Sequence, residues 1–275
     1  MEWSEGRKLT KLTYHPTYSS TNRVTTYQYD HNGTLIKRTD SSGSYVIFQM
    51  VDGKAVGETR YNASGTVTLY MRYTFDEQGS VVGISLWYPS QGAWTDFYFA
   101  KNLQGDVVAV YRESDKALVA SYAYDSWGNI LSKSGNLADI NPLRYRSYYF
   151  DTESWFYYLQ SRFYDPAIGR FINADDPALL GANGDFASQN LFTYCGNNPV
   201  IRADTGGHAW ETIFDVLSIG ASIMEVAFNP ADPFTWLGLA GDAVDLIPFV
   251  TGVGETIRAL KTASKVADGA DDAID

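Results

Sequence analysis

The single cysteine, Cys195, is the strongest nucleophile that the sequence offers for covalent catalysis. A cysteine becomes reactive when a histidine beside it takes the thiol proton. The nearest histidine in the sequence is His208, so a catalytic pair would form only if the fold brought the two together. In the segment TYCGNNP, however, the cysteine precedes a turn-forming run of Gly, Asn and Pro. We therefore interpret Cys195 as a small buried residue, and one cysteine cannot form a disulfide within the chain.

Metal and cofactor chemistry finds little support in the sequence. The three histidines, His15, His31 and His208, are scattered along the chain, and a single cysteine cannot supply a cysteine-based metal site. The sequence also contains no glycine-rich phosphate loop and no zinc-protease helix motif. We therefore expect no metal, no cofactor and no toxin active site in this chain.

A cluster of aromatic residues raises the question of sugar binding. Trp87, Tyr88 and Trp94 lie close together in the segment LWYPSQGAW, and sugars stack on exposed aromatic faces. Aromatic rings also pack against one another and against neighbouring strands in sheets. We favour strand packing for these rings, and a cell-surface carbohydrate-binding or adhesion protein is the alternative function.

The composition favours β structure and argues against a nucleic-acid partner. The chain contains 20 Tyr, 14 Phe, 7 Trp and 24 Gly; aromatic residues suit pleated surfaces and glycine supplies tight turns. The net charge is −11, whereas a protein that binds nucleic acid needs a basic face. Residues 203–275 hold 12 acidic and 3 basic side chains, and this step in charge indicates a domain boundary.

A short pattern recurs along the first half of the chain. It consists of an aromatic residue, often Asp or Asn, two or three further residues, Gly, and then a β-branched pair, as in YQYDHNGTLI and TFDEQGSVV. Asp or Asn caps a turn, Gly adopts the positive φ, and alternating apolar residues form the outgoing strand. The pattern predicts β-hairpins that turn near Gly33, Gly65, Gly79, Gly105 and Gly128.

The change of pattern along the chain predicts three parts. Residues 1–140 are expected to form an antiparallel sheet of β-hairpin repeats. Residues 141–208 are dense in Tyr, Phe and Arg, then rich in Asn, Gly and Pro, which is typical of short strands and loops. Residues 209–275 have helical patterning, with two or three helices before residue 267. The predicted fold class is therefore mainly β, with a C-terminal α-helical segment.

The second part carries a family resemblance. The sequence NPLRYRSYYFDTESWFYYLQSRFYDPAIGRFINADD, followed by NLFTYCGNNPVIRADTGGHAW, closely resembles the Rhs (rearrangement hotspot) repeat-associated core domain. Residues 27–131 resemble the tyrosine–aspartate (YD) repeats that precede this core. Residues 209–275, especially DLIPFVTGVGETIRALK, resemble the helical pre-toxin segment of polymorphic toxins. The resemblance covers nearly the whole chain.

The resemblance implies a function in encapsulation. YD repeats form a sheet that spirals into a hollow shell, the core domain caps one end as a plug, and a variable toxin is held inside. We therefore expect a structural encapsulation and delivery module of an Rhs polymorphic toxin used in bacterial competition, with the toxin domain absent. The expected partners are the remainder of the shell, a C-terminal toxin, an immunity protein and surface carbohydrate.

The expected location is secreted or cell-surface, as part of a larger protein. The N-terminal sequence MEWSEGRKLTKLTYHP contains no apolar stretch, so this chain has no signal peptide of its own. The sequence begins within a repeat-like region, which predicts a partial shell. A free-standing toxic segment formed by residues 209–275 is a further alternative.

The resemblance also implies that the chain is at most an intramolecular aspartyl autoprotease. Matching the family motifs places Arg170 and Asp175 in GRFINADD, with Asp176 as the adjacent alternative, and Asp204 in ADTGG. Of two carboxylates held close together, one stays protonated and acts as the acid while the other activates water. An arginine beside them would orient one carboxylate.

The expected cut lies between His208 and Ala209. Thr205 stands where the family has proline, and proline would restrict the loop that carries the bond. The sequence therefore predicts slow or absent self-cleavage.

Overall fold

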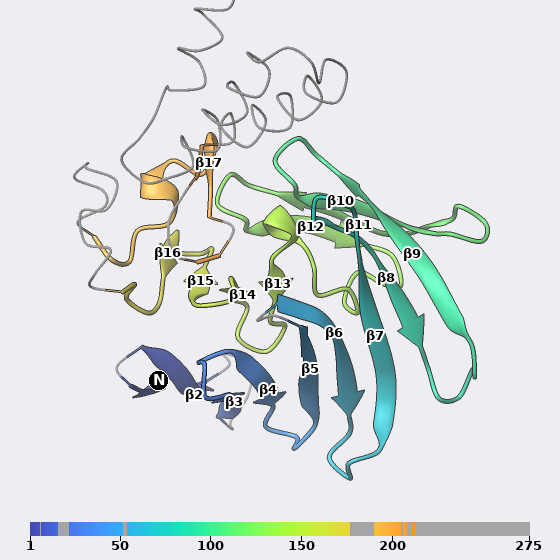
Figure 1. Cartoon of the computed structure of the whole chain (residues 1–275), viewed down its shortest axis with the longest axis horizontal. Coiled ribbons are helices and arrows are strands. Elements are labelled where there is room, and N and C mark those ends of the chain that lie inside the picture. The colour runs from blue at the N-terminus through green and yellow to red at the C-terminus, as the bar shows by residue number, and fades with distance from the viewer. Residues whose placement is uncertain are drawn as a thin grey trace, which may run out of the picture. The chain divides into compact units, whose positions relative to one another are not determined.

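The computed structural model (Figure 1) describes residues 1–5, 7–15, 22–51, 54–176, 190–204, 206–207 and 211–212. The chain divides into two compact units. The first consists of Met1–Asp175 and Gly206–His208, and the second contains the remainder of the chain. The first unit holds the two larger sheets.

Twelve antiparallel strands form one sheet in which each strand pairs with the next in the sequence. This order confirms the predicted hairpin sheet, and Figure 1 shows the strands following one another from blue to green. The strands are β1 (Glu2–Ser4), β2 (Lys8–Tyr14), β3 (Arg23–Tyr29), β4 (Leu35–Thr39), β5 (Tyr45–Val51), β6 (Lys54–Tyr61), β7 (Val67–Phe75), β8 (Val81–Trp87), β9 (Trp94–Lys101), β10 (Val107–Arg112), β11 (Leu118–Tyr124) and β12 (Ile130–Ser134).

One five-residue turn is used repeatedly between these strands. In its first copy the amide of Asp30 donates to the carbonyl of Thr34 at 2.9 Å, and the amide of Gly33 donates back to Asp30 at 3.1 Å. The Asp30 carboxylate also accepts the amides of Asn32 and Thr34. A side chain that satisfies backbone amides, followed by a glycine at positive φ, makes the turn stable without a longer loop.

Six copies of this turn are present among the described residues. They begin at Asp30, Asp40, Asn62, Asp76, Asn102 and Asp125. The five predicted glycine turns are confirmed, and a sixth at Gly43 was missed. The segment DSSG carries the same Asp and Gly spacing, so the signal for it was present in the sequence.

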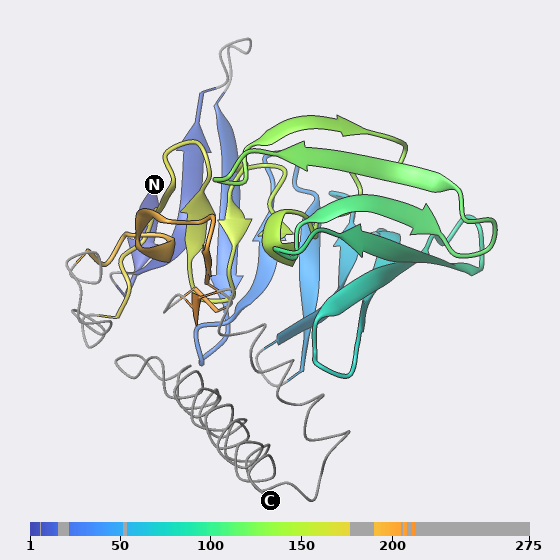
Figure 2. The ribbon, with the colours of Figure 1, turned by 90° about the horizontal axis from the view of Figure 1, so that it is seen from above.

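The inner face of the sheet is apolar because side chains alternate along each strand. In β7, Leu69, Met71 and Tyr73 are buried, whereas Tyr70 and Arg72 between them are exposed. The buried residues of β7 to β11 share one core cluster with Leu137, Ala138 and Leu143, which follow the last strand. The sheet is therefore curved, as Figure 2 shows, and the chain after β12 returns to its inner face.

A second, four-stranded sheet consists of β13 (Tyr149–Phe150), β14 (Tyr157–Tyr158), β15 (Phe163–Asp165) and β16 (Arg170–Phe171). The short 3-10 helix η1 (Tyr145–Ser147) precedes it. Phe156 and Phe163 of this region share a core cluster with side chains from β2 to β5. Residues 141–175 thus cover the inner face of the large sheet, as a core plug would.

The second unit contains a short pair of strands, and the second of these lies where a helix was expected. β17 (Arg202–Ala203) pairs with β18 (Glu211–Thr212), and the 3-10 helix η4 (Cys195–Asn197) precedes them. The predicted helical segment was placed from residue 209, so its beginning is corrected: residues 211–212 are extended. The rest of that segment lies outside the described residues, and the division at residues 140 and 208 stays a prediction.

Asp151 fixes the plug to the large sheet through buried polar contacts. Its carboxylate is 1% exposed, forms an ion pair with Arg38 of β4, and accepts the hydroxyls of Tyr27 at 2.7 Å and Ser154 at 2.8 Å. Burial alone raises the pKa of the Asp151 carboxyl, but Arg38, Tyr27, Ser154 and the amide of Glu153 together lower the pKa below its usual value. The carboxylate is therefore charged in the folded protein.

This contact predicts a loss of stability in acid. A carboxyl whose pKa is lower in the folded state contributes stability above its unfolded pKa of about 4, and that stability is lost as the pH falls through the folded pKa. At pH 7 we expect Asp151→Asn to lower the free energy of unfolding by about 3–5 kcal/mol, since it leaves Arg38 buried without its partner. The difference from the parent should shrink at pH 3.

Urea unfolding at pH 7, 5 and 3 measures this effect. Asp115→Asn is the matched control, because Asp115 is exposed and pairs with Arg112 on the surface; it should cost at most about 1 kcal/mol. A difference between Asp151→Asn and the parent that stays constant with pH would contradict the assignment.

Two turn glycines with the same backbone conformation predict different costs of substitution. Gly105 (φ +85) and Gly128 (φ +89) are both left-handed, but a Cβ on Gly105 meets nothing within 4 Å, whereas one on Gly128 would lie 2.6 Å from the Tyr145 ring. We expect Gly105→Ala to cost about 1–2 kcal/mol and Gly128→Ala roughly 1–3 kcal/mol more. Urea unfolding of both variants is the measurement, and equal losses would show that the ring does not pack there.

Candidate active site

Arg162 connects two parts of the first unit that are distant in the sequence. Its guanidinium is buried and forms an ion pair with Asp175, in which Nη2 of Arg162 lies 2.9 Å from Oδ2 of Asp175. Its Nε atom donates to the carbonyl of Gly207. The guanidinium also lies 3.5 Å from the centroid of the Phe171 ring. A buried arginine is tolerated only when its charge and its donors are satisfied in this way.

Burial alternates from the end of β16 to Asp175. Phe171 of β16, Asn173 and Asp175 are buried, and the residues between them are more exposed. The Asn173 side chain accepts the amide of Phe163 at 2.9 Å and donates to the carbonyl of Arg7 at 3.0 Å. These two contacts hold the segment in the register that places Asp175 next to Arg162.

Ser161 adds a second donor at the same carbonyl. Its Oγ atom lies 2.8 Å from the carbonyl oxygens of both Gly206 and Gly207. Gly207 has φ +77, and a Cβ there would lie 2.5 Å from both the Leu159 carbonyl and Ser161 Oγ. Only glycine fits this close approach, so the identity of residue 207 is set by the contact.

Arg162, rather than the predicted Arg170, is the arginine that contacts Asp175. Arg170 is exposed and lies opposite Asp165 in the pairing of β15 with β16. Burial alternates from residue 170 to residue 176, which places Arg170 on the exposed side. The catalytic role of Arg170 stays a prediction.

The remaining predicted residues have different surroundings. Asp204 is 1% exposed and belongs to the second unit, as does the half-buried alternative Asp176. Thr205, and the predicted bond between residues 208 and 209, lie outside the described residues. The catalytic roles of Asp175 and Asp204 stay predictions.

The comparisons with known proteins agree with this architecture. The family model "Teneurin YD-shell" matches residues 12–200. The chain belongs to this family. The resemblance to Rhs/YD-repeat proteins is thereby confirmed.

Relatives of the YD-shell chain are much longer proteins. This chain is 33% identical to the tRNA3(Ser)-specific nuclease WapA of Bacillus spizizenii, over 78% of this chain and 9% of that protein. It is 35% identical to the double-stranded DNA deaminase toxin A of Burkholderia cenocepacia, over 31% of this chain and 6% of that protein. The chain therefore spans less than a tenth of the length of either relative.

Solved structures share the fold of the YD-shell chain. The crystal structure of TcdB2-TccC3-TEV superposes with a TM-score of 0.59 at 19% identity, covering 75% of this chain and 10% of that one. The crystal structure of TcdB2-TccC3 gives a TM-score of 0.57 at 19% identity, over 74% of this chain and 10% of that one. At this level of identity the likeness concerns the fold alone.

Cys195 is buried, which confirms its interpretation from the sequence. His208 lies outside the described residues. Within the part of the chain that the structure describes, no three His, Cys, Asp or Glu side chains are grouped as a metal site would need. The helices described there include none with the length and hydrophobicity to cross a membrane.

The aromatic patch on the YD-shell sheet is engaged with its own neighbours. Trp87 pairs with Trp94 across β8 and β9, and the Tyr70 ring meets Trp87 edge-on with centroids 5.3 Å apart. The Arg72 guanidinium lies 4.0 Å from the Trp94 centroid. These contacts are the packing that we favoured from the sequence, and sugar binding at this surface stays a prediction.

The two arginines give a direct test of the site. Arg162→Gln removes the buried ion pair with Asp175, and we expect it to cost about 3–5 kcal/mol of stability. Arg170→Gln changes an exposed side chain and should stay within roughly 0.5 kcal/mol of the parent. Urea unfolding of both variants is the measurement, and a larger loss at Arg170 would reverse the assignment.

Proposed function

We propose that this chain is part of a shell that encloses and delivers a toxin, and that it cleaves itself slowly between His208 and Ala209. Two findings support encapsulation: the curved sheet with its plug, and the long YD-shell relatives whose names describe a nuclease and a toxin. In this proposal the remaining shell and a C-terminal toxin are its partners, with an immunity protein in the producing cell. The proposed location is secreted or cell-surface, within a larger protein.

The contact of Arg162 with both Asp175 and Gly207 is the observation that carries the self-cleavage proposal. Arg162 orients the Asp175 carboxylate, and the same guanidinium holds the backbone one residue before the predicted bond. A carboxylate and a peptide segment are thus bound by one rigid, planar group. Positioning of this kind lowers the barrier to reaction, because the reacting groups no longer have to find each other.

The proposed reaction is hydrolysis of the bond between His208 and Ala209. A water molecule loses a proton to one carboxylate, and its oxygen bonds to the carbonyl carbon of His208. The second carboxyl gives its proton to the amide nitrogen of Ala209, and the C–N bond breaks. Asp175 and Asp204 are the two carboxyl groups of the proposal, and the products are a new carboxyl group on His208 and a new amine on Ala209.

The proposal predicts how three substitutions change cleavage. Asp175→Asn and Asp204→Asn should each abolish it, since one carboxyl cannot serve as both base and acid. Thr205→Pro within a full-length shell should speed it up, because proline restricts the loop. Intact-mass analysis over days at pH 5 to 8 would detect a tail that begins at Ala209. Cleavage that persists in both Asp→Asn variants would assign the cut to another protease.

Neighbouring glycines predict a second effect on the rate. Gly207→Ala would place a methyl group against Leu159 and Ser161, whereas a Cβ on Gly206 meets nothing within 4 Å. We expect Gly207→Ala to slow cleavage by about 100-fold, the scale of a misplacement of roughly 1 Å, and Gly206→Ala to have a much smaller effect. The tail released per hour by each variant is the measurement. Equal rates in the two variants would show that the close approach at Gly207 is not needed.

A further inference from the structure

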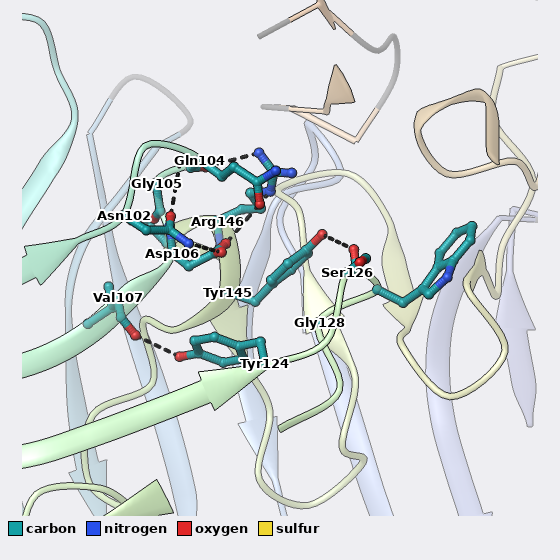
Figure 3. A network of polar contacts seen from close by, with 12 residues as sticks. Asn102, Gln104, Gly105, Asp106, Val107, Tyr124, Ser126, Gly128, Tyr145 and Arg146 are labelled. Atoms are coloured by element: carbon teal, nitrogen blue, oxygen red, sulfur yellow. Dashed lines mark hydrogen bonds and ion pairs between the residues drawn. The ribbon is translucent and has the colours of Figure 1, made fainter. Parts of the chain in front are cut away.

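The turn Asp125–Asn129, between β11 and β12, is bound by the plug at three consecutive carbonyl groups. Each of the three accepts a tyrosine hydroxyl, and all three tyrosines are at most 1% exposed. Figure 3 shows the first of these contacts. The hydroxyls donate from Tyr145 to Ser126 at 2.8 Å, from Tyr164 to Trp127 at 2.7 Å, and from Tyr157 to Gly128 at 2.9 Å.

Shape complementarity adds to these hydrogen bonds. Asn129 donates to the carbonyl of Pro166 at 3.0 Å. The Trp127 ring lies so close to Gly169 that a Cβ there would be 2.8 Å from it. The turn therefore contacts the plug before β13, at β14, at β15 and in the loop before β16.

The preceding turn of the same type is also held by the plug, but by different groups. Arg146 donates from its backbone to the Asp106 carboxylate at 2.9 Å and from its side chain to the carbonyl of Gln104 at 3.0 Å. Ser147 donates to the carbonyl of Gly105 at 2.9 Å. These contacts involve η1 alone, whereas the tyrosines extend to the strands that flank Arg162.

Two of the tyrosines lie in the strands that flank the loop of the candidate site. Tyr157 lies in β14 and Tyr164 in β15, and the loop between these strands contains Ser161 and Arg162. The loop is closed by a hydrogen bond from the amide of Leu159 to the carbonyl of Arg162 at 2.9 Å. A shift of either strand would therefore move the donors that hold Gly207.

We propose that Tyr145, Tyr157 and Tyr164, here named the tyrosine clamp, couple the last repeat hairpin of the sheet to the backbone of Gly207. The clamp keeps β14 and β15 in the register in which Ser161 and Arg162 reach that carbonyl. Its consequence for self-cleavage rests on the proposed function: the three tyrosines are positioning residues, and a shell whose last hairpin is not folded would not present the bond correctly.

Hydrogen exchange of the full chain tests the coupling directly. The double variant Tyr157→Phe, Tyr164→Phe removes two hydroxyls and keeps both rings. The matched control is Tyr124→Phe, because the Tyr124 hydroxyl donates to the carbonyl of Val107 at 2.9 Å within the large sheet (Figure 3). We expect the double variant to exchange about tenfold faster than the parent in the peptide that contains Gly207, since each hydrogen bond contributes modestly to stability. The control should match the parent there.

The same peptide provides the result that would overturn the coupling. If exchange at Gly207 in the double variant equals that in Tyr124→Phe, the clamp does not act on this segment. Circular dichroism first establishes that each variant is folded. Should the double variant fail to fold, Tyr164→Phe alone replaces it, with an expected acceleration of about threefold.

Intact-mass analysis then separates the coupling from the proposed function. In a parent chain that cleaves, the double variant should release its tail more slowly and cut at neighbouring bonds as well, an effect that a loss of stability alone does not produce. A single cut at the parent rate would refute the positioning role. A parent chain that never cleaves, even with Thr205→Pro, would refute the proposed self-cleavage, and hydrogen exchange would still decide for or against the clamp.

Discussion

The inner face of the twelve-stranded sheet must be covered, and most of the structure follows from this requirement. Hairpins that pair only with their sequence neighbours cannot bury both faces, so alternation leaves one face apolar. The chain after β12 supplies the cover by returning over that face with residues 137–175. Repeat sheets in general depend on such additional elements, because each repeat contacts only its neighbours.

Covering the face buries polar groups, and the most deeply buried carboxylate of the sheet is matched by partners. Glu58 of β6 is 0% exposed, and its carboxylate binds Arg60 at 2.6 Å and the hydroxyl of Tyr73 at 3.2 Å. Arg60 in turn donates to the carbonyl of Ile140 at 2.8 Å, which belongs to the covering segment. An unmatched charge at this depth would cost several kcal/mol, so these pairs specify how the plug sits on the sheet.

The candidate site uses the same principle at the plug's own edge. Arg162 is more deeply buried than Arg60, and it binds a carboxylate and a main-chain carbonyl close to the predicted cut. A guanidinium can bind both because its donors lie in one plane and point in different directions. Tyrosine hydroxyls provide the link from this loop to the repeat sheet, since each ring packs in the core while its hydroxyl reaches a turn carbonyl.

The sequence by itself determined the repeat. Local spacing of Asp or Asn with Gly predicts each turn, and strand alternation predicts the sheet, because both signals lie within a few residues. The turn at Gly43 obeys the same local rule, because DSSG has the same Asp and Gly spacing. The helix expected at residues 211–212 was wrong, because helical periodicity cannot reveal a strand partner elsewhere in the chain.

Only the tertiary structure decided which residues meet at the site. Arg170 is near Asp175 in the sequence, but its side chain is exposed. Arg162, in the loop between β14 and β15, forms the ion pair with Asp175. The three tyrosines likewise bind a turn more than fifteen residues away from each of them. Such contacts depend on how two sheets pack, and the residue spacing within either sheet carries no information about that packing.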